Sequence, residues 1–551
     1  MNIYLIIALL SFSQLITVNQ LHAQNNTYHY VLKARPSAEG LYLDVSLNYT
    51  ADSTHILHLP SDYYGTPDLH QWVINFKGVN GTQVLKKEAA SREIIPDKRH
   101  EVHIEYTIKY DAKELDKYAY APNVSPHYFY LAGCQWILPT NLIEQKNTYH
   151  IQLKSDKSDW VFYSSLAENT NDILLTCSFE EIISAGFGGS DATQDKHYFQ
   201  LNGKKFSLFI QGDYKFDKSQ VLQSFKSIIT KQNSFLTDED SSFYHITILP
   251  RSGLLAGASI PHMFYCFIDS NTRHRDLNQL VSHEYFHNWL PNKMNLKTAK
   301  GQYEFQREWF SEGFTEYFSR VFLYEMDLLT PDEFVETFNA DIVSIKNNPS
   351  AVHSYADIVE LAVKNQYGAA QKKLSYYRGA LIALKWDYEL KRKGSDLKEM
   401  MLFLFEKAKS AQHMLNDSDL FQYGRQYALD FEKDIQDYII NGNAIPLYET
   451  AFPGYTLVNR EINLFYSGFD EQRSAKEKII QGVDINGPAY RAGLRDGMQY
   501  VSRQNSNRWS NSWSKDKPYT VIIKQDTSEI PIHFFPEGRA VTVNVYTKMT
   551  N

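Results

Sequence analysis

The sequence predicts a multidomain protein with a β-sandwich-like N-terminal domain, a mainly helical α+β domain and a small β-rich C-terminal domain. The chain has 551 residues, which is too long for one ordinary hydrophobic core. Apolar residues alternate with polar ones up to about residue 215, follow a mainly helical period from about residue 274 to 447, and return to strand-like runs after about residue 450. Strands followed by runs of helices are typical of an α+β domain.

Composition narrows the classes of function. The chain is 43% hydrophobic and 22% charged, as in ordinary globular proteins. Its formal net charge is −8 and it has no long basic run, which argues against a nucleic-acid partner. The cysteines Cys134, Cys177 and Cys266 form no CxxC pair and no zinc-knuckle spacing. They leave two alternatives open, one disulfide or three buried free thiols.

Residues 1–23 differ from the rest of the chain. They contain the apolar stretch IYLIIALLSF, then polar residues, then the small residue Ala23. This outline predicts a secretory signal peptide, although no Lys or Arg precedes the apolar stretch. A buried strand and a membrane anchor are the alternatives, but the stretch is shorter than the roughly 20 residues of a membrane span. We therefore expect a secreted or periplasmic mature protein without a membrane span.

Residues 24–215 are expected to form the N-terminal β-rich domain. The runs LYLDVSLNYT (41–50) and EVHIEYTIKY (101–110) alternate apolar and polar side chains. A strand with one buried face requires this alternation. Further runs of the same kind are YHIQLK, DWVFYS and FSLFIQG. No catalytic constellation is visible in this domain.

Residues 216–448 are expected to form the catalytic domain. Its first helix, 217–235, carries apolar side chains on one face. The strand YHITIL (244–249) follows, then the Gly-containing loop RSGLLAGASIP (251–261), then the strand HMFYCFI (262–268). From about residue 274 to 447 the pattern is mainly helical.

The pattern His-Glu-x-x-His occupies residues 283–287. Positions i and i+4 share one face of a helix, so His283 and His287 can bind one zinc ion. Glu284 is placed to take a proton from zinc-bound water and pass it to the leaving amine. We expect Asp276 to cap this helix and Pro291 to mark its end.

The next amphipathic helix, REWFSEGFTEYFSRVFLYE, supplies the third ligand. Catalytic zinc takes three protein ligands and leaves one position open. Glu312 is the natural third ligand, separated from His287 by residues 288–311. Glu316 lies one turn further along the same face. It is either the carboxylate partner of a metal-bound histidine or an exposed helix glutamate.

HEYFHNW followed by WFSEGFTEYF resembles the gluzincin clan of metallopeptidases, which includes thermolysin and the large aminopeptidases. The spacing and the order of domains most resemble the glycyl aminopeptidase family. The resemblance implies a thermolysin-like catalytic domain, one Zn²⁺ per chain and hydrolysis of peptide bonds, with aminopeptidase activity as one form of it. It covers the mature chain and is sharpest over residues 283–317.

The resemblance also suggests an oxyanion-stabilising tyrosine in SYYRGALIALKWDYEL. In the clan, the tyrosine of Tyr-x-Lys-Gly donates a hydrogen bond to the tetrahedral intermediate. That pattern maps onto residues 376–379 and makes Tyr376 the candidate. Tyr377 is the alternative, because a shift of one residue would exchange the two. Both could also be core aromatics at the start of a helix.

One segment departs from the pattern of the clan's aminopeptidases. These enzymes bind the substrate's amine with a glutamate in a Gly-rich segment before the substrate-lining strand. The corresponding stretch, SGLLAGASIPHMFYCFI, keeps Gly253 and Gly257 but has no acidic residue. His262 cannot replace a carboxylate as the partner of an ammonium group. The sequence therefore leaves aminopeptidase and endopeptidase activity as alternatives.

Residues 449–551 are expected to form the third domain. The segment IIQGVDINGPAYRAGLRDGMQYVSR resembles the core of a PDZ domain, with a strand at 479–485 and a short helix at 489–492 before the turn at Gly493. Tyr466–Phe469 is the candidate carboxylate-binding loop. Such a domain binds extended peptides at a sheet edge. A purely structural β-domain is the alternative.

Three functions remain open from the sequence. Zinc-dependent hydrolysis of peptide bonds is the leading hypothesis, because the residues that it requires are all present: His283, His287, Glu284, Glu312 and Tyr376. A zinc hydrolase acting on a non-peptide amide or ester would use the same groups. A non-catalytic protein that binds peptides through the PDZ-like domain is the third. The sequence predicts neither the substrate nor the oligomeric state.

Overall fold

A computed structural model describes residues 27–37, 40–60, 68–109, 121–138, 146–168, 171–236, 242–251, 254–298, 302–348, 350–364, 369–504 and 518–549. The predicted signal peptide at residues 1–23 lies outside these residues. The chain divides into two compact units, Met1–Asn288 and Trp289–Asn551. Each unit is described by itself below.

The first unit begins with a six-stranded sheet in the order β12-β10-β1-β2-β7-β4. Its strands are β1 (Thr27–Ser37), β2 (Gly40–Thr50), β4 (Val73–Gly78), β7 (Glu101–Ile108), β10 (Asn147–Ser155) and β12 (Asp172–Cys177). β1 and β10 are parallel, and the other neighbours are antiparallel. Burial alternates along β2, which confirms the period of two predicted for residues 41–50.

Two smaller sheets share a core with this sheet. One contains β3 (His55–His58), β5 (Gln83–Glu88) and β6 (Ser91–Ile95); the other contains β8 (Asn123–Ser125), β9 (Tyr128–Ala132), β11 (Val161–Ser164) and β13 (Gly186–Ser190). The short helix α2 (Phe179–Ser184) follows β12 and precedes β13. All three cysteines of the chain are buried free thiols, so the disulfide alternative is excluded.

A five-stranded sheet completes the first unit, in the order β14-β15-β16-β18-β17. Its strands are β14 (Asp195–Leu201), β15 (Lys204–Ile210), β16 (Phe243–Pro250), β17 (Leu255–Ile260) and β18 (Met263–Ile268). The prediction of a loop at 251–261 was wrong over its second half, because β17 forms an antiparallel edge strand there. The expected boundary at 215–216 falls after β14 and β15, which pair into this sheet.

His245 is a titratable group buried in this sheet, on β16. Its side chain is 0% exposed, and its Nδ1 has no hydrogen-bond partner among the described residues. Its Nε2 lies 3.5 Å from the carbonyl oxygen of Ala167. Burial lowers the pKa of His245 to about 4. The folded protein therefore favours the neutral imidazole.

This burial predicts a pH-dependent loss of stability. The pKa of His245 in the folded chain is lower than the ~6.5 of an unfolded chain. The neutral, buried His245 therefore contributes its full stabilisation of the folded state above pH 6.5, and this stabilisation is lost as the pH falls toward 4. It amounts to roughly 3 kcal/mol in the free energy of unfolding. Denaturant titrations at stepped pH should show this loss in the parent and a smaller one in His245→Gln. The control variant His58→Gln changes an exposed histidine and should behave as the parent. If the free energy of unfolding of His245→Gln depends on pH as it does in the parent, the prediction is refuted.

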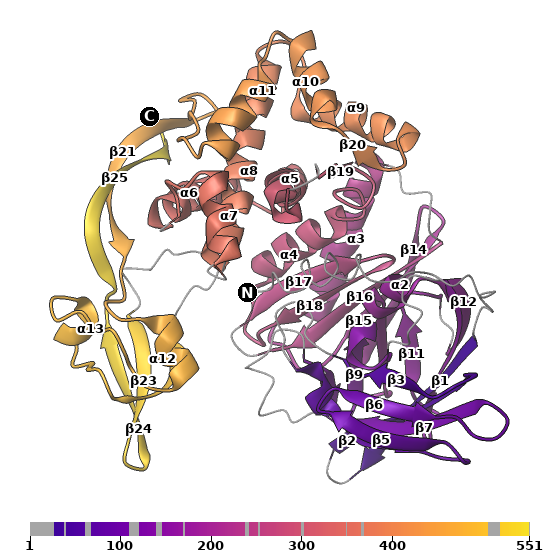
Figure 1. Ribbon diagram of the computed structural model, residues 1–551. Helices are drawn as coiled ribbons and strands as arrows, with labels where there is room; N and C mark the ends of the chain where they lie inside the picture. The colour runs from indigo at the N-terminus through magenta and orange to yellow at the C-terminus, as the bar shows by residue number, and fades with distance from the viewer. Residues whose placement is uncertain are drawn as a thin grey trace. The chain divides into compact units, whose positions relative to one another are not determined.

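Two helices lie against the five-stranded sheet, as Figure 1 shows: α3 (Lys218–Phe235) and α4 (His274–Phe286). They contact each other, and α4 also contacts the edge strand β17. Buried Gln232 of α3 donates hydrogen bonds to the backbone carbonyl and the hydroxyl of Ser282 on α4, at 2.8 and 2.9 Å. Tyr285 of α4 donates to Asn233 at 3.0 Å. These bonds fix the orientation of α4 against α3.

After the short strand β19 (Asn295–Leu296), the first part of the second unit is mainly helical, as predicted. The α-helices of this part are α5 (Glu308–Glu325), α6 (Pro331–Asn347), α7 (Tyr355–Val363), α8 (Ala369–Lys391), α9 (Leu397–Ser410), α10 (Asp417–Gln426) and α11 (Phe431–Asp434), which continues into a π-helical turn, Ile435–Ile440. Thr330 and Ser354 cap α6 and α7 with their side-chain oxygens. Within the described residues, no helix combines the length and the apolar character needed to cross a membrane.

The second unit ends in β-structure. β21 (Tyr455–Phe465) and β25 (Glu537–Lys548) form a long antiparallel ribbon, and β22 (Gln499–Gln504), β23 (Tyr519–Gln525) and β24 (Ser528–Phe534) form a three-stranded sheet. Figure 1 shows both in orange to yellow, with the short helices α12 (Glu471–Glu477) and α13 (Pro488–Arg491) beside the sheet. Asn339 of α6 exchanges two hydrogen bonds, 2.9 and 2.8 Å, with the backbone of Tyr546 on β25.

The C-terminal predictions were partly correct. α13 lies where the short helix was expected, and Gly493 follows it with φ 99°, a conformation that glycine adopts without strain. The strand expected at 479–485 was wrong: only Ile479 forms an isolated bridge, to Gln499. Exposed residues such as Ile485, 65% exposed, show why the apolar pattern misled.

Candidate active site

The two histidines lie at the C-terminal end of α4. α4 ends at Phe286 rather than near Pro291, but His287 keeps helical backbone angles, φ −61° and ψ −14°. His283 and His287 therefore still share one face, and their Nε2 atoms lie 3.1 Å apart. Each is only 8% exposed. Two imidazoles are thus held side by side in a buried position.

The prediction that Asp276 caps α4 was wrong. Arg273 is the N-cap residue, and Asp276 lies in the first helical turn. The Asp276 carboxylate accepts two hydrogen bonds from the Arg273 guanidinium, at 2.8 and 2.9 Å. A carboxylate in the first turn still stabilises the helix through its dipole.

Glu284 lies between the histidines and faces the edge strand β17. Its side chain is 5% exposed. A Cβ added to Gly257 of β17 would lie 2.6 Å from both Cγ and Oε1 of Glu284. Only a glycine at this position allows the strand and the Glu284 carboxylate to come this close. The sequence could reveal the glycine but not what it touches.

A substitution at Gly257 tests this contact. In Gly257→Ala the new methyl group would push the Glu284 carboxylate from its place, and a shift of about 1 Å can lower turnover about 100-fold. We expect kcat to fall by this order while zinc content stays at the parental level. Successive side chains of a strand point to opposite faces, so Ala256→Ser is the matched control. A parental kcat in Gly257→Ala would show that the contact does not position Glu284.

The segment in which an amine-binding glutamate would be expected contains β17, and its described residues include no acidic side chain. β17 contains only small and aliphatic side chains, and Gly253 lies outside the described residues. His262 lies in the turn between β17 and β18 with φ 62°. Its ring packs beside Phe243, with the centroids 5.2 Å apart. Any carboxylate that binds an amine must therefore come from another element.

Glu312 lies on α5, next to an unusually close crossing with α8. A Cβ on Gly313 would lie 2.3 Å from Cα of Gly379, and a Cβ on Gly379 would lie 1.9 Å from the carbonyl oxygen of Trp309. The two helix backbones are therefore in direct contact. Tyr376 precedes Gly379 by three residues and shares its face of α8. The crossing thus places Tyr376 on the side of α8 that packs against α5.

His283, His287 and Glu312 form a group that can hold a metal ion. One ligand atom from each lies within 4.8 Å of the others. The donor set fits zinc, which takes imidazole nitrogen and carboxylate oxygen. The two Nε2 atoms lie 3.1 Å apart, close enough for one zinc ion to be held by both. Three protein ligands leave one coordination position for a water molecule or the substrate.

Glu316 belongs to a buried ionic network that the sequence analysis did not identify. Arg320 donates to Glu316 at 3.1 Å and binds both oxygens of Asp341, at 2.5 and 3.2 Å. Arg320 and Asp341 are 4% and 3% exposed. Burial raises the pKa of Asp341 to about 6, while the neighbouring Arg320 acts in the opposite direction. This network excludes the alternative that Glu316 is an exposed helix glutamate. The four-residue spacing could have indicated the pair of Glu316 and Arg320, but nothing in the sequence indicated that Asp341 joins it.

The two candidate tyrosines have different surroundings. Tyr377 packs toward α6, where it hydrogen-bonds Ser344 and lies near Asp341, and burial raises its pKa. The ammonium group of Lys373 lies 3.7 Å from the ring centroid of Tyr376. Tyr376 and Tyr377 are both partly exposed. Because Tyr377 is already engaged with α6, the surroundings favour Tyr376 for a role toward substrate.

Glu308 is a further carboxyl group on α5 that the sequence analysis missed. It lies one turn before Glu312 on the same face. Burial raises its pKa to about 7, although Lys372 nearby acts in the opposite direction. Its Oε2 is buried and has no hydrogen-bond partner among the described residues. The four-residue spacing from Glu312 was the available signal in the sequence.

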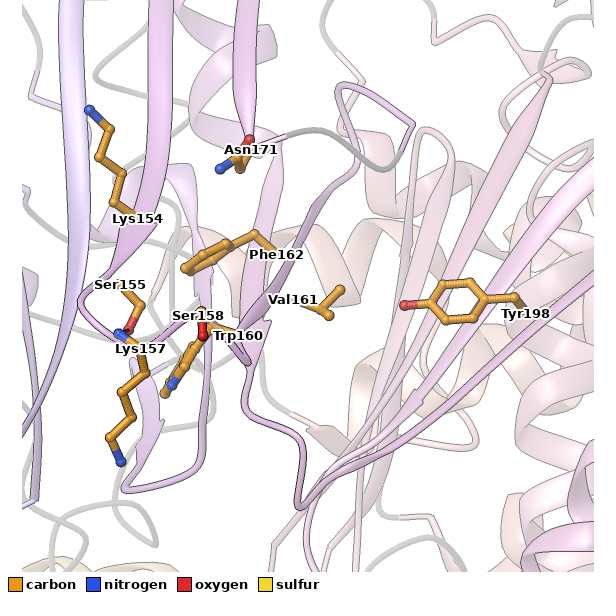
Figure 2. A pocket seen from close by; sticks show the side chains of 9 residues that line it. All are labelled: Lys154, Ser155, Lys157, Ser158, Trp160, Val161, Phe162, Asn171 and Tyr198. Carbon is orange, nitrogen blue, oxygen red and sulfur yellow. Dashed lines mark hydrogen bonds between the residues drawn. The ribbon is translucent and has the colours of Figure 1, made fainter.

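A cavity of about 600 Å³ lies elsewhere in the first unit. Figure 2 shows its lining, with Tyr198 on one side and two lysines on the other. The lining residues are Lys154, Ser155, Lys157, Ser158, Trp160, Val161, Phe162, Asn171 and Tyr198. None of the predicted site residues lines this cavity, so we do not place the chemistry there.

Comparison with known proteins places the candidate site in one family's pattern. The model of the M61 glycyl aminopeptidase family matches residues 276–382, the segment that runs from the first turn of α4 into α8 and includes Tyr376. The earlier resemblance to this family is thereby confirmed for that segment. No curated protein matches the chain in sequence.

Solved structures resemble the chain in fold. An aminopeptidase N family protein from Idiomarina loihiensis superposes with a TM-score of 0.68 at 16% identity, over 95% of this chain and 98% of that one. An M1 zinc metallopeptidase from Deinococcus radiodurans reaches a TM-score of 0.41 at 14% identity, over 77% of this chain and 96% of that one. The first of these shows a shared fold, with a sheet-rich N-terminal region, a helical middle and a β-rich C-terminal region.

Proposed function

Residues 276–382 carry the pattern of the M61 glycyl aminopeptidases, which are metallopeptidases, and on this premise we propose that the chain hydrolyses peptide bonds at a zinc ion held by His283, His287 and Glu312. The observation that carries the proposal is the buried histidine pair grouped with a carboxylate, with ligand atoms within 4.8 Å. One zinc ion per chain is the expected stoichiometry.

Each protein group has a defined task in this proposal. Zinc, when bound, would polarise the scissile carbonyl and lower the pKa of a water molecule. The Glu284 carboxylate accepts a proton from that water and returns it to the leaving amine. The Tyr376 hydroxyl donates a hydrogen bond to the oxygen on which negative charge develops. Glu316, held by Arg320, is proposed to accept the remaining N–H of a metal-bound histidine.

We also propose the finer features that accompany this activity. The substrate is a peptide, and trimming from the amino terminus is the favoured form of cleavage. The protein acts outside the cytoplasm after removal of residues 1–23. The C-terminal β-domain is PDZ-like and takes an extended peptide; α13 and the glycine turn after it support this assignment.

The test combines metal analysis with substrate mapping. The mature protein is prepared with and without a chelator, zinc is quantified, and a mixed peptide library is digested and read by mass spectrometry. We expect about one zinc per chain, cleavage that chelation removes and zinc restores, and products shortened from the amino terminus. Absence of zinc after reconstitution would refute the site. Stoichiometric zinc without cleavage of any peptide would refute peptide hydrolysis.

A further inference from the structure

Glu308 is a buried carboxyl group to which the proposed mechanism gives no task. It begins α5, one helical turn before Glu312. Its Oε2 is enclosed and receives no hydrogen bond from the described residues, while the residue as a whole stays partly exposed. A buried anion without a partner is costly to the fold and usually has a functional reason.

The nearby cations leave Glu308 without an ion pair. The Arg307 guanidinium is bound to Asp417, at 2.8 and 3.1 Å. The Lys373 ammonium lies over the ring of Tyr376, and Lys372 is exposed to solvent. No described residue forms a salt bridge with Glu308, and burial accordingly raises its pKa to about 7. The position therefore has the charge to bind a cation supplied from outside.

The distance along the helix suits the amino group of a bound peptide. Glu308 and Glu312 are four residues apart on the helix, which corresponds to a rise of about 6 Å at 1.5 Å per residue. In a peptide the α-amino nitrogen lies two bonds of about 1.5 Å from the carbonyl carbon of the same residue. If the scissile carbonyl of the first residue lies at the metal held by Glu312, its amine lies within a few ångströms of that metal, a length comparable with the rise from Glu312 to Glu308.

We propose that the Glu308 carboxylate binds the free α-ammonium group of the substrate's first residue and thereby selects peptides with an unblocked amino terminus. This inference rests on the proposed function, because it assumes a carbonyl positioned at the zinc site. It supplies the recognition of the amine that the described residues of β17 lack. An ammonium group and a carboxylate in a partly enclosed site form charge-assisted hydrogen bonds, which are stronger than neutral ones.

The first test compares an alanine-terminated tripeptide with its N-acetylated form. Glu308→Gln keeps the shape of the side chain and removes its charge. We expect kcat/KM on the free-amine peptide to fall about 10- to 100-fold, mostly through KM, with any cleavage of the acetylated peptide unchanged. Glu308→Asp should retain part of the preference. Glu304→Gln, an exposed glutamate one turn earlier, is the matched control and should behave as the parent. Equal losses on both peptides, or no loss on the free-amine peptide, would overturn the proposal.

A binding measurement separates this proposal from peptide hydrolysis itself. Calorimetry on the zinc-loaded protein compares alanine hydroxamate with N-acetylalanine hydroxamate. We expect the parent to bind the free-amine form at least about tenfold more tightly and Glu308→Gln to bind the two forms equally. A parent that binds them equally, or a variant that keeps the preference, would overturn the role of Glu308. A zinc-loaded parent that shows the preference but cleaves no peptide would refute the proposed function while supporting the amine site.

Discussion

Replacing Glu284 by Gln is expected to lower peptide hydrolysis by about 10²- to 10⁴-fold while leaving zinc bound. The amide cannot accept the proton of the attacking water, but it has nearly the same size as the carboxylate. The enclosed contact with Gly257 should therefore be preserved. His283 and His287 are unchanged, so metal affinity should remain close to that of the parent. The measurements are initial rates on a peptide found by library digestion and zinc per chain in the same preparations.

A second substitution on the same helix provides the control. Asp276→Asn removes a charge from the first turn of α4, at a position bound to Arg273 and distant along the helix from the histidines. It should keep parental rates and parental zinc. Glu284→Gln retaining more than about a tenth of the parental rate would contradict its assignment as the proton acceptor. Loss of zinc from that variant would show instead that Glu284 contributes to metal binding.

Replacing Gly379 by Ala is expected to destabilise the protein by about 3 kcal/mol, the upper range for an overpacked core position. The added Cβ would lie 1.9 Å from the carbonyl oxygen of Trp309, and backbone atoms cannot rotate away as a side chain would. α8 must therefore move from α5, and Tyr376 moves with it. Urea titrations should show a lower midpoint, and kcat should fall even where the protein is fully folded.

Gly394→Ala is the comparison for this prediction. Gly394 has φ +85°, and nothing lies within 4 Å of a Cβ built on it. The substitution costs only the backbone strain of a left-handed residue, roughly 1 kcal/mol. If Gly379→Ala costs no more than Gly394→Ala, the close crossing does not contribute to stability as we argue. A parental kcat in Gly379→Ala would show that Tyr376 does not depend on the crossing.

Much of the fold could be predicted because local patterns and burial agree. The period of two along β2 and the helical period of α3 each reflect one buried face, and the structure has both elements. The prediction that His283 and His287 share one face rested on helical spacing alone, and in the structure the two rings lie side by side. The match to one family covers residues 276–382, the segment that contains these motifs.

Other features could not be predicted, because they depend on contacts between segments far apart in the sequence. β17 is built from small residues that carry little pattern, and it is a strand because β18 pairs with it. Arg320 and Asp341 meet across two helices, so neither residue alone indicated the ion pair. Asp276 resembled a cap, yet the helix begins two residues earlier. Each of these depends on tertiary packing rather than on local propensity.

The crossing of α5 and α8 has a consequence for engineering this protein. Gly313 and Gly379 lie against each other, and no amino acid is smaller than glycine. A bulkier residue at one position therefore has no compensating substitution at the other. Libraries that vary both positions together would recover only the parental pair. Attempts to change substrate preference should keep this pair fixed and vary exposed positions of α8, such as Lys372, where the side chain meets solvent.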